Sequence, residues 1–129
     1  MTMANYPDDL RYTDDHEYVR LEGEIATIGI TSFAVNQLGD IVFVELPRVG
    51  TEVSQGEELG TIESVKAVAE FYTPIGGTVI ESNTTLEDSP ELISDDPYGE
   101  GWLVKIRVNN SIELENTLSA DEYQNYLRE

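Results

Sequence analysis

A short pattern that occurs twice in the middle of the sequence constrains the fold more than any other feature. Residues 47–53 and 74–80 both begin Pro-x-x-Gly-Thr, and each copy has an aliphatic residue two positions after the threonine. Between the copies lie residues 60–70, which are rich in β-branched side chains and so favour extended structure. Two similar units joined through this stretch predict a quasi-symmetric β-sandwich with its joint at one end, near Lys66.

The joint contains one of the two lysines in the chain. Two extended runs, residues 59–65 and 67–72, meet at Lys66. No Asn-Gly or Asp-Gly pair marks a hairpin turn there, so a single long strand is the competing interpretation. The repeated pattern favours a hairpin that displays Lys66 at its tip. The alternative role for this lysine is an ordinary solvated surface charge.

The N-terminal part of the chain predicts a hairpin, a short helix and a strand. Residues 12–21 and 25–30 are two partly alternating runs on either side of a glycine, which is typical of a hairpin. Thr31 is suited to cap a short helix, and Gly39 is well placed to end it. Residues 41–46 then form the most apolar strand candidate in the chain.

The C-terminal part predicts two helices and a strand. Ser89, followed by proline, suits the start of a helix. Ser119 and Glu122 form a capping box for a last helix that would run to about Leu127. Residues 102–108 alternate as a strand with one face toward the core, formed by Trp102, Val104, Ile106 and Val108.

The chain is strongly acidic, with 26 Asp and Glu residues against 7 Lys and Arg residues and a formal net charge of −19. Such a charge repels phosphate backbones and anionic lipid, so we expect neither nucleic acid nor a membrane as a partner. Basic partner surfaces are favoured instead, although a uniformly solvated acidic coat explains the same balance. The length of 129 residues fits one domain.

The N-terminus has no targeting signature. Its first ten residues include Asp8 and Asp9 but no arginine or lysine, unlike a signal or transit peptide. No apolar run approaches the roughly 18 residues expected of a membrane span. We therefore expect a cytoplasmic protein, or a mitochondrial matrix protein if the chain is the processed form of an organellar precursor.

Few residue types suited to catalysis are present. The chain has no cysteine and a single histidine, His16, so thiolate chemistry is excluded and a Ser-His-Asp arrangement has only His16 available. Neither a GxxxxGK[ST] phosphate loop nor a GxGxxG motif occurs. These absences favour a non-catalytic protein without a metal site. The other class considered is a carrier, whose chemistry resides on a covalently attached group. A lysine amine is a suitable attachment point, and lipoate would add the missing thiols.

The residues around Lys66 look like a lipoyl-attachment motif, Glu63-Ser64-Val65-Lys66-Ala67, with Gly50 upstream and Gly77 downstream. Further blocks resemble the glycine cleavage system H protein family in the same order along the chain, namely residues 16–20, 29–31, 38–47, 88–93 and 96–102. The chain departs from the family at Tyr18, where tryptophan is commoner, at Arg48, where an acidic residue is frequent, and at residues 69–71 after the lysine. None of these departures touches the attachment motif.

The resemblance implies a mainly β, lipoyl-domain-like barrel-sandwich hybrid with short helices and a C-terminal helix. Residues 1–129 would form a single lipoyl-carrier domain with an N-terminal hairpin extension. Lipoate-attaching enzymes would modify Lys66 to lipoyllysine, and the flanking motif residues would form the recognition frame. A biotinyl domain is disfavoured because methionine normally flanks its lysine, whereas Val65 and Ala67 do so here.

The implied role is to carry the aminomethyl group of glycine between enzymes. A pyridoxal-phosphate glycine decarboxylase would load it, and a tetrahydrofolate-dependent aminomethyltransferase would receive it. Dihydrolipoamide dehydrogenase would then accept the electrons. Two alternatives stay open: a lipoyl-relay protein that donates lipoate to other enzymes, and an unmodified interaction module.

A polar cluster suggests how the cargo is protected. The aminomethyl group is an amine, expected to be cationic, and is lost if water reaches it. We hypothesise that Asp15, His16, Glu17 and Glu70 lie close enough to receive it, with carboxylates pairing with the ammonium group. The alternative is that these residues are solvated or structural.

Overall fold

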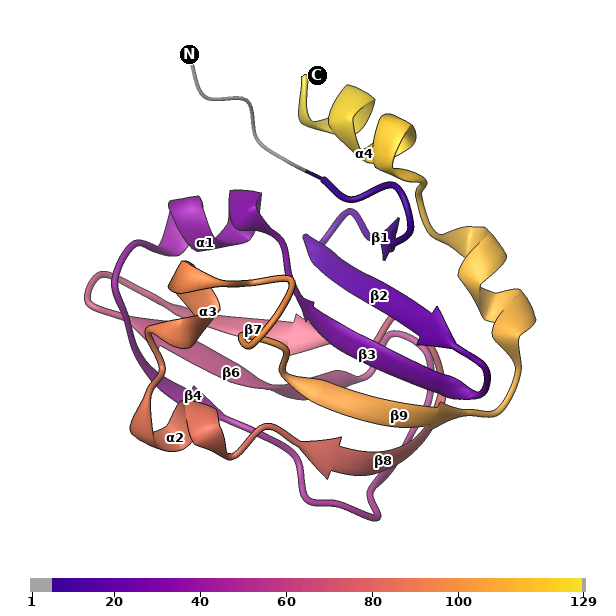
Figure 1. Ribbon diagram of the computed structural model, residues 1–129, viewed down its shortest axis with the longest axis horizontal. Coiled ribbons are helices and arrows are strands. Elements are labelled where there is room, and N and C mark those ends of the chain that lie inside the picture. The colour runs from indigo at the N-terminus through magenta and orange to yellow at the C-terminus, as the bar shows by residue number, and fades with distance from the viewer. Residues whose placement is uncertain (1–5, 129) are drawn as a thin grey trace.

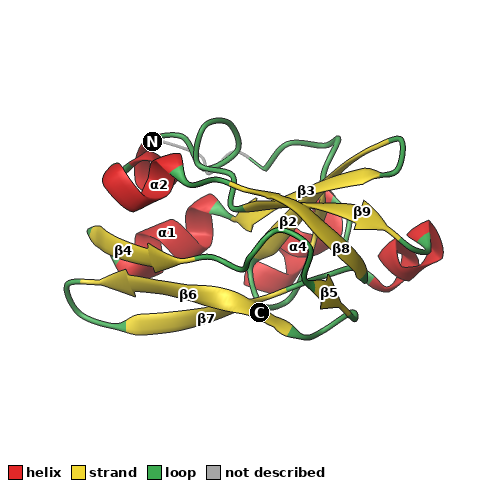
Figure 2. Ribbon diagram, turned by 90° about the horizontal axis from the view of Figure 1, so that it is seen from below, coloured by secondary structure: helices red, strands yellow, loops and turns green. Residues whose placement is uncertain are grey.

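Two antiparallel β-sheets face each other across the core in the computed structural model, which describes residues 6–128 (Figures 1 and 2). The larger sheet has the order β1-β2-β3-β9-β8-β5 and the smaller one β4-β6-β7. No helix within residues 6–128 is long and apolar enough to cross a membrane. The strands are β1 Arg11–Tyr12, β2 Glu17–Glu22, β3 Ile25–Ile30, β4 Ile41–Glu45, β5 Glu52–Val53, β6 Glu58–Ser64, β7 Val68–Tyr72, β8 Gly77–Ser82 and β9 Val104–Val108. The helices are α1 Ser32–Leu38, α2 Thr85–Asp88, α3 Leu92–Asp95, the 3₁₀ helix η1 Ser111–Asn116 and α4 Ala120–Leu127.

The N-terminal elements are those predicted. β2 pairs with β3 through a turn in which Gly23 has a φ of 62°, a conformation that glycine adopts without strain. The Thr31 hydroxyl accepts the Ala34 N–H at 3.3 Å and caps α1, and Gly39 ends the helix with a φ of 79°. The predicted hairpin and helix are therefore confirmed.

The two Pro-x-x-Gly-Thr copies lie side by side and bond to each other. The Gly50 N–H donates to the Val79 carbonyl at 2.7 Å, and the Val79 N–H donates to the Thr51 carbonyl at 2.8 Å. β5 then pairs with β8, with Val53 opposite Gly77. The chain between the copies forms the β6–β7 hairpin, whose tip lies at the opposite end of the molecule from β5 (Figure 2). The predicted β-sandwich with its joint at one end is confirmed.

The main core lies between the two sheets. Alternate residues of each sheet point inward, as the two-residue period of a strand requires. Removing this apolar surface from water is the dominant favourable term in folding. Fully buried side chains come from both layers: Ile28, Val104 and Ile106 from the larger sheet, and Val44, Ile62 and Phe71 from the smaller one.

A second, aromatic cluster fixes the C-terminal helix on the N-terminal segment. The rings of Tyr12 and Tyr123 stack at 4.9 Å with an angle of 7° between their planes. Ser119 and Glu122 form the predicted capping box at the start of α4. Because α4 packs beside β1, it lies close to the residues that precede β2.

The structure corrects two sequence predictions and shows one exposed residue in an apolar strand. The predicted helix start at Ser89 is wrong, because α2 comes first and α3 begins only at Leu92, after a turn in which the Ser89 carbonyl accepts the Leu92 N–H at 3.1 Å. Trp102 is not on the core face of β9: it precedes the strand, and its ring lies 4.9 Å from the Lys105 ammonium. Phe43, in the most apolar strand, is 51% exposed because an irregularity shifts the register of β4.

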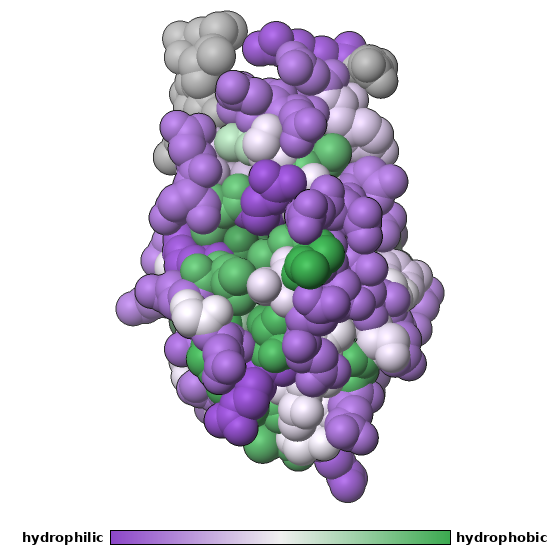
Figure 3. Space-filling view, turned by 90° about the vertical axis from the view of Figure 1, so that its right-hand side faces the viewer, coloured by the Kyte–Doolittle hydropathy of each residue, from purple (hydrophilic) through white to green (hydrophobic). Residues whose placement is uncertain are grey.

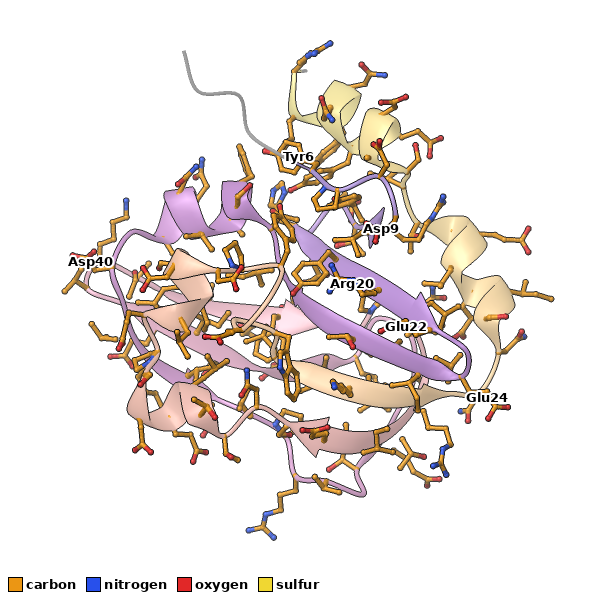
Figure 4. All side chains as sticks on the ribbon, viewed as in Figure 1. Tyr6, Asp9, Arg20, Glu22, Glu24 and Asp40 are labelled. Atoms are coloured by element: carbon orange, nitrogen blue, oxygen red, sulfur yellow. The ribbon has the colours of Figure 1, made fainter. Side chains whose placement is uncertain are left out.

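Except for the buried Glu17, nearly all acidic residues within residues 6–128 are exposed and form an outward-facing coat. Side chains such as Glu22, Glu24 and Asp40 point away from the ribbon (Figure 4). On the side that carries η1 and the β2–β3 turn, hydrophilic residues surround a central hydrophobic area (Figure 3). Within residues 6–128 one ion pair forms, between Lys105 and Glu81 at 3.8 Å. The net charge is therefore largely left to solvent.

Gly77 lies where β8 and β9 approach each other closely, so a substitution there tests this packing. A Cβ atom there would overlap the Arg107 carbonyl oxygen and lie 2.6 Å from Ile106 Cγ2. We expect Gly77→Ala to lower the free energy of unfolding by about 1–3 kcal/mol or more, measured by urea denaturation. The neighbouring Thr78→Ala serves as a control and should lower it by less than about 1 kcal/mol. Equal effects would contradict the packing role of Gly77.

Candidate functional site

The tip of the β6–β7 hairpin presents Lys66 to solvent. The Ser64 N–H donates to the Ala67 carbonyl at 2.8 Å, and the Ser64 hydroxyl accepts the Lys66 and Ala67 N–H groups at 3.3 and 3.1 Å. The Val65 N–H donates to the Asp40 carbonyl at 3.1 Å, which ties the tip to the segment after α1. The predicted hairpin is therefore confirmed, and the single long strand is wrong.

This turn is not of the type that an Asn-Gly or Asp-Gly pair marks. Those turns need positive φ angles, and His16 is the only non-glycine residue within residues 6–128 with a positive φ. The backbone at Val65 and Lys66 is therefore in an ordinary conformation. The buried Ser64 hydroxyl stabilises the turn by bonding to backbone groups two and three residues ahead. Ser64 is thus a local sequence signal for this hairpin turn, and the prediction of the hairpin did not rest on it.

Lys66 has no ion-pair partner within the described part of the chain. Its side chain runs past the end of α1, since a Cβ atom built on Gly39 would lie 3.6 Å from Lys66 Cε and 4.0 Å from Nζ. Asp40 follows at the same end of the molecule (Figure 4). The lysine is therefore accessible at its tip and next to one helix.

The predicted frame of the attachment motif divides into two groups. Glu63, Val65 and Ala67 are exposed around Lys66, so the structure brings them together with it. Gly50 and Gly77 lie in the paired repeats instead, away from the hairpin tip. Gly50 has a φ of 96°, and Gly77 is held against β9. In this structure the two glycines act on the sandwich that supports the hairpin.

A cavity of about 230 Å³ lies between α1 and the smaller sheet. The helix α1 contributes to its wall and also ends at Gly39 beside Lys66, so the cavity and the hairpin tip share this helix. The four residues predicted to receive the cargo all line this one cavity. Its polar lining is Asp15, His16, Glu17, Gln37 and Glu70, and its apolar lining is Ile30, Phe33, Ala34, Leu38, Ile62, Ala69 and Phe71.

Glu17 is the most buried acidic residue of the cavity, with 2% of its surface exposed. Its Oε1 accepts the Thr13 hydroxyl at 2.7 Å, and its Oε2 accepts the Tyr72 N–H at 3.1 Å. Burial raises the pKa of Glu17 to about 7, and these two hydrogen bonds oppose that rise in part. Glu17 therefore has a proton affinity unlike that of an ordinary surface carboxylate.

His16 is held by residues far along the chain. Its φ of 71° is unusual for a residue with a side chain. Its Nδ1 lies 2.7 Å from the Tyr123 hydroxyl, which lies 2.8 Å from the Thr31 hydroxyl. Burial lowers the pKa of His16, against the attraction of Asp15 and Asp14. The ring is thus half-buried, and its burial favours the neutral imidazole.

Two features of the site were missed by sequence reasoning. Tyr123 was not among the predicted site residues, because no local pattern links it to His16, 107 positions earlier. A second cavity of about 340 Å³ shares Asp15 and Glu17 with the first and is also lined by Tyr72 and Tyr126. Its walls come from five separate parts of the chain, so no short motif predicts it.

Ionisation of Glu17 should destabilise the fold as the pH rises. Its folded-state pKa of about 7 lies above the usual 4.5, so the native state binds this proton more tightly than the unfolded chain. Its contribution to stability is therefore lost between about pH 4.5 and pH 7. Glu17→Gln cannot ionise. From about pH 4 to pH 8 we expect the free energy of unfolding of the wild type to fall, relative to this variant, by on the order of 3 kcal/mol. Denaturation curves that stay parallel would contradict the burial argument.

Comparison with known proteins places these features in a family. The family described as glycine cleavage H-protein matches residues 10–129. The chain is 68% identical over 120 residues to the glycine cleavage system H protein of Gloeothece citriformis, covering 92% of each chain, and 60% identical over 124 residues to that of Trichormus variabilis, covering 96% and 95%. A crystal structure of a glycine cleavage system H protein from Mycobacterium marinum superposes with a TM-score of 0.88 at 40% identity, covering 96% of this chain and all of that one. The barrel-sandwich fold implied by the sequence is confirmed, and the chain belongs to the glycine cleavage H-protein family, a family of carrier proteins.

Proposed function

We propose that this chain holds lipoate covalently on Lys66 and carries the aminomethyl group of glycine within the glycine cleavage system. It receives this group at a pyridoxal-phosphate glycine decarboxylase and delivers it to a tetrahydrofolate-dependent aminomethyltransferase. Electrons pass to dihydrolipoamide dehydrogenase, and the chain itself is not catalytic. The observation that carries the proposal is the position of Lys66, exposed at a serine-braced hairpin tip beside a helix that also lines a cavity.

The residues present fit a lipoyl group. An exposed lysine amine can form a stable amide, and the cavity joins apolar walls to a carboxylate-rich part. Glu70 follows Lys66 by four residues, about 13 Å of extended strand, which exceeds the reach of the lysine stem alone. When bound, the lipoyl group supplies the sulfur that holds the aminomethyl group and the dithiol that is later reoxidised.

The hairpin tip displays the lysine. Ser64 fixes the turn through its hydroxyl, so Lys66 projects from a rigid support rather than a mobile loop. Glu63, Val65 and Ala67 are exposed beside it and form the surface that lipoate-attaching enzymes recognise. Attachment removes the charge of Lys66, so the lysine acts through its reach and not through its ammonium.

The cavity shelters the cargo. The carboxylates of Asp15, Glu17 and Glu70 accept hydrogen bonds from the cationic amine, and apolar side chains such as Phe33 exclude water. A nearby cation favours the ionised form of a carboxyl group, so cargo binding opposes the burial that raises the pKa of Glu17. Binding and ionisation of Glu17 are therefore coupled.

The surface charge supports protein partners of opposite sign. A net charge of −19 steers the chain toward basic surfaces on the partner enzymes and away from nucleic acid and anionic membranes. The named relatives are bacterial proteins, which supports a cytoplasmic location.

Attachment is tested by the mass of the intact protein made in a lipoylating host. We expect one lipoyl increment on the wild type and none on Lys66→Ala. The matched control is Lys105→Ala, which removes the only other lysine and should keep the increment. An increment that survives Lys66→Ala, or a wild type without one, would exclude Lys66 as the attachment site.

Shelter by Glu17 is tested by the release of bound methylamine from the loaded carrier. We expect Glu17→Gln to release it about tenfold faster or more, because the variant loses a charge-assisted hydrogen bond worth roughly 1.5–3 kcal/mol. Glu22→Gln changes an exposed carboxylate on the same strand and should match the wild type. An unchanged rate in Glu17→Gln would remove Glu17 from this role.

A further inference from the structure

A buried chain of hydrogen bonds links the C-terminal helix to His16. The Tyr123 hydroxyl oxygen lies 2.7 Å from His16 Nδ1 and 2.8 Å from the Thr31 hydroxyl oxygen. The same Thr31 oxygen accepts the Ala34 N–H at 3.3 Å. Thr31 and Tyr123 are each 0% exposed, so the protons of both hydroxyl groups must find their acceptors inside the protein.

Only one arrangement of protons satisfies both hydroxyl groups within residues 6–128. If Thr31 donates to Tyr123, then Tyr123 donates to His16 Nδ1 and both hydroxyl protons are paired. In the reverse arrangement Nδ1–H donates to Tyr123 and Tyr123 donates to Thr31, whose own proton then has no acceptor among the described residues. An unpaired buried donor destabilises a fold. Nδ1 is therefore the acceptor, and the neutral ring carries its proton on Nε2.

The other ring nitrogen is accessible. Within the described residues Nε2 has no hydrogen-bond partner, and no buried side-chain nitrogen or oxygen lacks one, so Nε2 is not buried. His16 lines the cavity, and its ring packs at 4.6 Å from that of Phe33. The ring therefore offers an N–H donor in place of a basic lone pair.

We propose that Tyr123 is a positioning residue that holds His16 in the Nε2–H tautomer and so keeps the imidazole ring from acting as a base in the cavity. The role in cargo protection rests on the function proposed above. The tautomer itself follows from the hydrogen bonds alone and is tested separately.

The way in which an aminomethyl group is lost from sulfur explains how this tautomer would protect the cargo. The unprotonated nitrogen can use its lone pair to form a C=N bond while the C–S bond breaks and its electron pair leaves on sulfur. Water then adds to the carbon to give formaldehyde and ammonia, and the sulfur takes up a proton. A protonated nitrogen has no lone pair and is stable to this loss. The carboxylates are paired with the ammonium group, whereas a free Nε2 lone pair would be available to take a proton from the water that adds to the carbon.

The tautomer is measured by ¹⁵N NMR on the unlipoylated chain, in which His16 is the only histidine. We expect Nδ1 to resonate as the unprotonated nitrogen and Nε2 as the protonated one. Tyr123→Phe keeps the ring that stacks on Tyr12 but removes the donor, and should give a mixture of tautomers. Tyr126→Phe makes the same change on the same helix, 6.2 Å from His16 between ring centroids, and should match the wild type. A protonated Nδ1 in the neutral wild-type ring would overturn the proposal without any variant.

The protective role is measured on the lipoylated chain, reduced and then loaded with formaldehyde and ammonium. We expect Tyr123→Phe to release ammonia several-fold faster than the wild type, whereas Glu22→Gln, changed at an exposed residue outside both cavities, should release it at the wild-type rate. A Tyr123→Phe variant with altered tautomers and an unchanged release rate would overturn the protective role. A wild type that takes no cargo would instead contradict the proposed carrier function and leave the tautomer result standing.

Discussion

Backbone pairing between the two Pro-x-x-Gly-Thr copies is the constraint on which the rest of the fold depends. The bonds from Gly50 to Val79 and from Val79 to Thr51 bring the ends of the central segment together. The chain between them must then fold back on itself, and β6 and β7 pair to satisfy their own backbone groups. Gly77 permits the close approach of β9 that completes the larger sheet. The exposed position of Lys66 is thus a consequence of pairing at the far end of the sandwich.

Glu17 joins the fold to the candidate site and is subject to opposing demands. Its carboxyl group accepts hydrogen bonds from Thr13 and from the backbone of Tyr72, so it connects the N-terminal segment to β7. Burial favours its neutral form, whereas the proposed cationic cargo favours its ionised form. A carboxyl group with a pKa near 7 meets both conditions, because little free energy separates its two protonation states at neutral pH. A fully exposed carboxylate would be screened by water and would hold the cargo weakly.

The sequence predicted features that depend on neighbouring residues or on a repeated pattern. The caps of α1 and α4, the β2–β3 turn and the β6–β7 hairpin all follow from signals within a few residues or from the two-copy repeat. Ser64 shows the limit of turn rules that look for glycine, because here the turn is stabilised by hydrogen bonds to a serine hydroxyl. Trp102 and α2 show a limit of predictions that use hydrophobic periodicity. The contact of Trp102 with the Lys105 cation produces no periodic pattern, and the four residues of α2 are too few to show one. The partnership of Tyr123 with His16 arises only when α4 packs beside β1.

The proposed attachment point and the proposed shelter depend on these two different kinds of contact, local and tertiary. Hydrogen bonds among Ser64, Lys66 and Ala67 stabilise the lysine tip, and each joins residues that are close in sequence. The bond from the Val65 N–H to the Asp40 carbonyl is the one that joins residues far apart in sequence. The cavity instead requires α1, both sheets and, through Tyr123, the C-terminal helix to be packed together. Loss of the packing of α4 would therefore affect the cavity more directly than the hydrogen bonds within the tip. The proposed attachment at Lys66 thus depends on a local hairpin, and the proposed protection of the cargo depends on the packing of the whole domain.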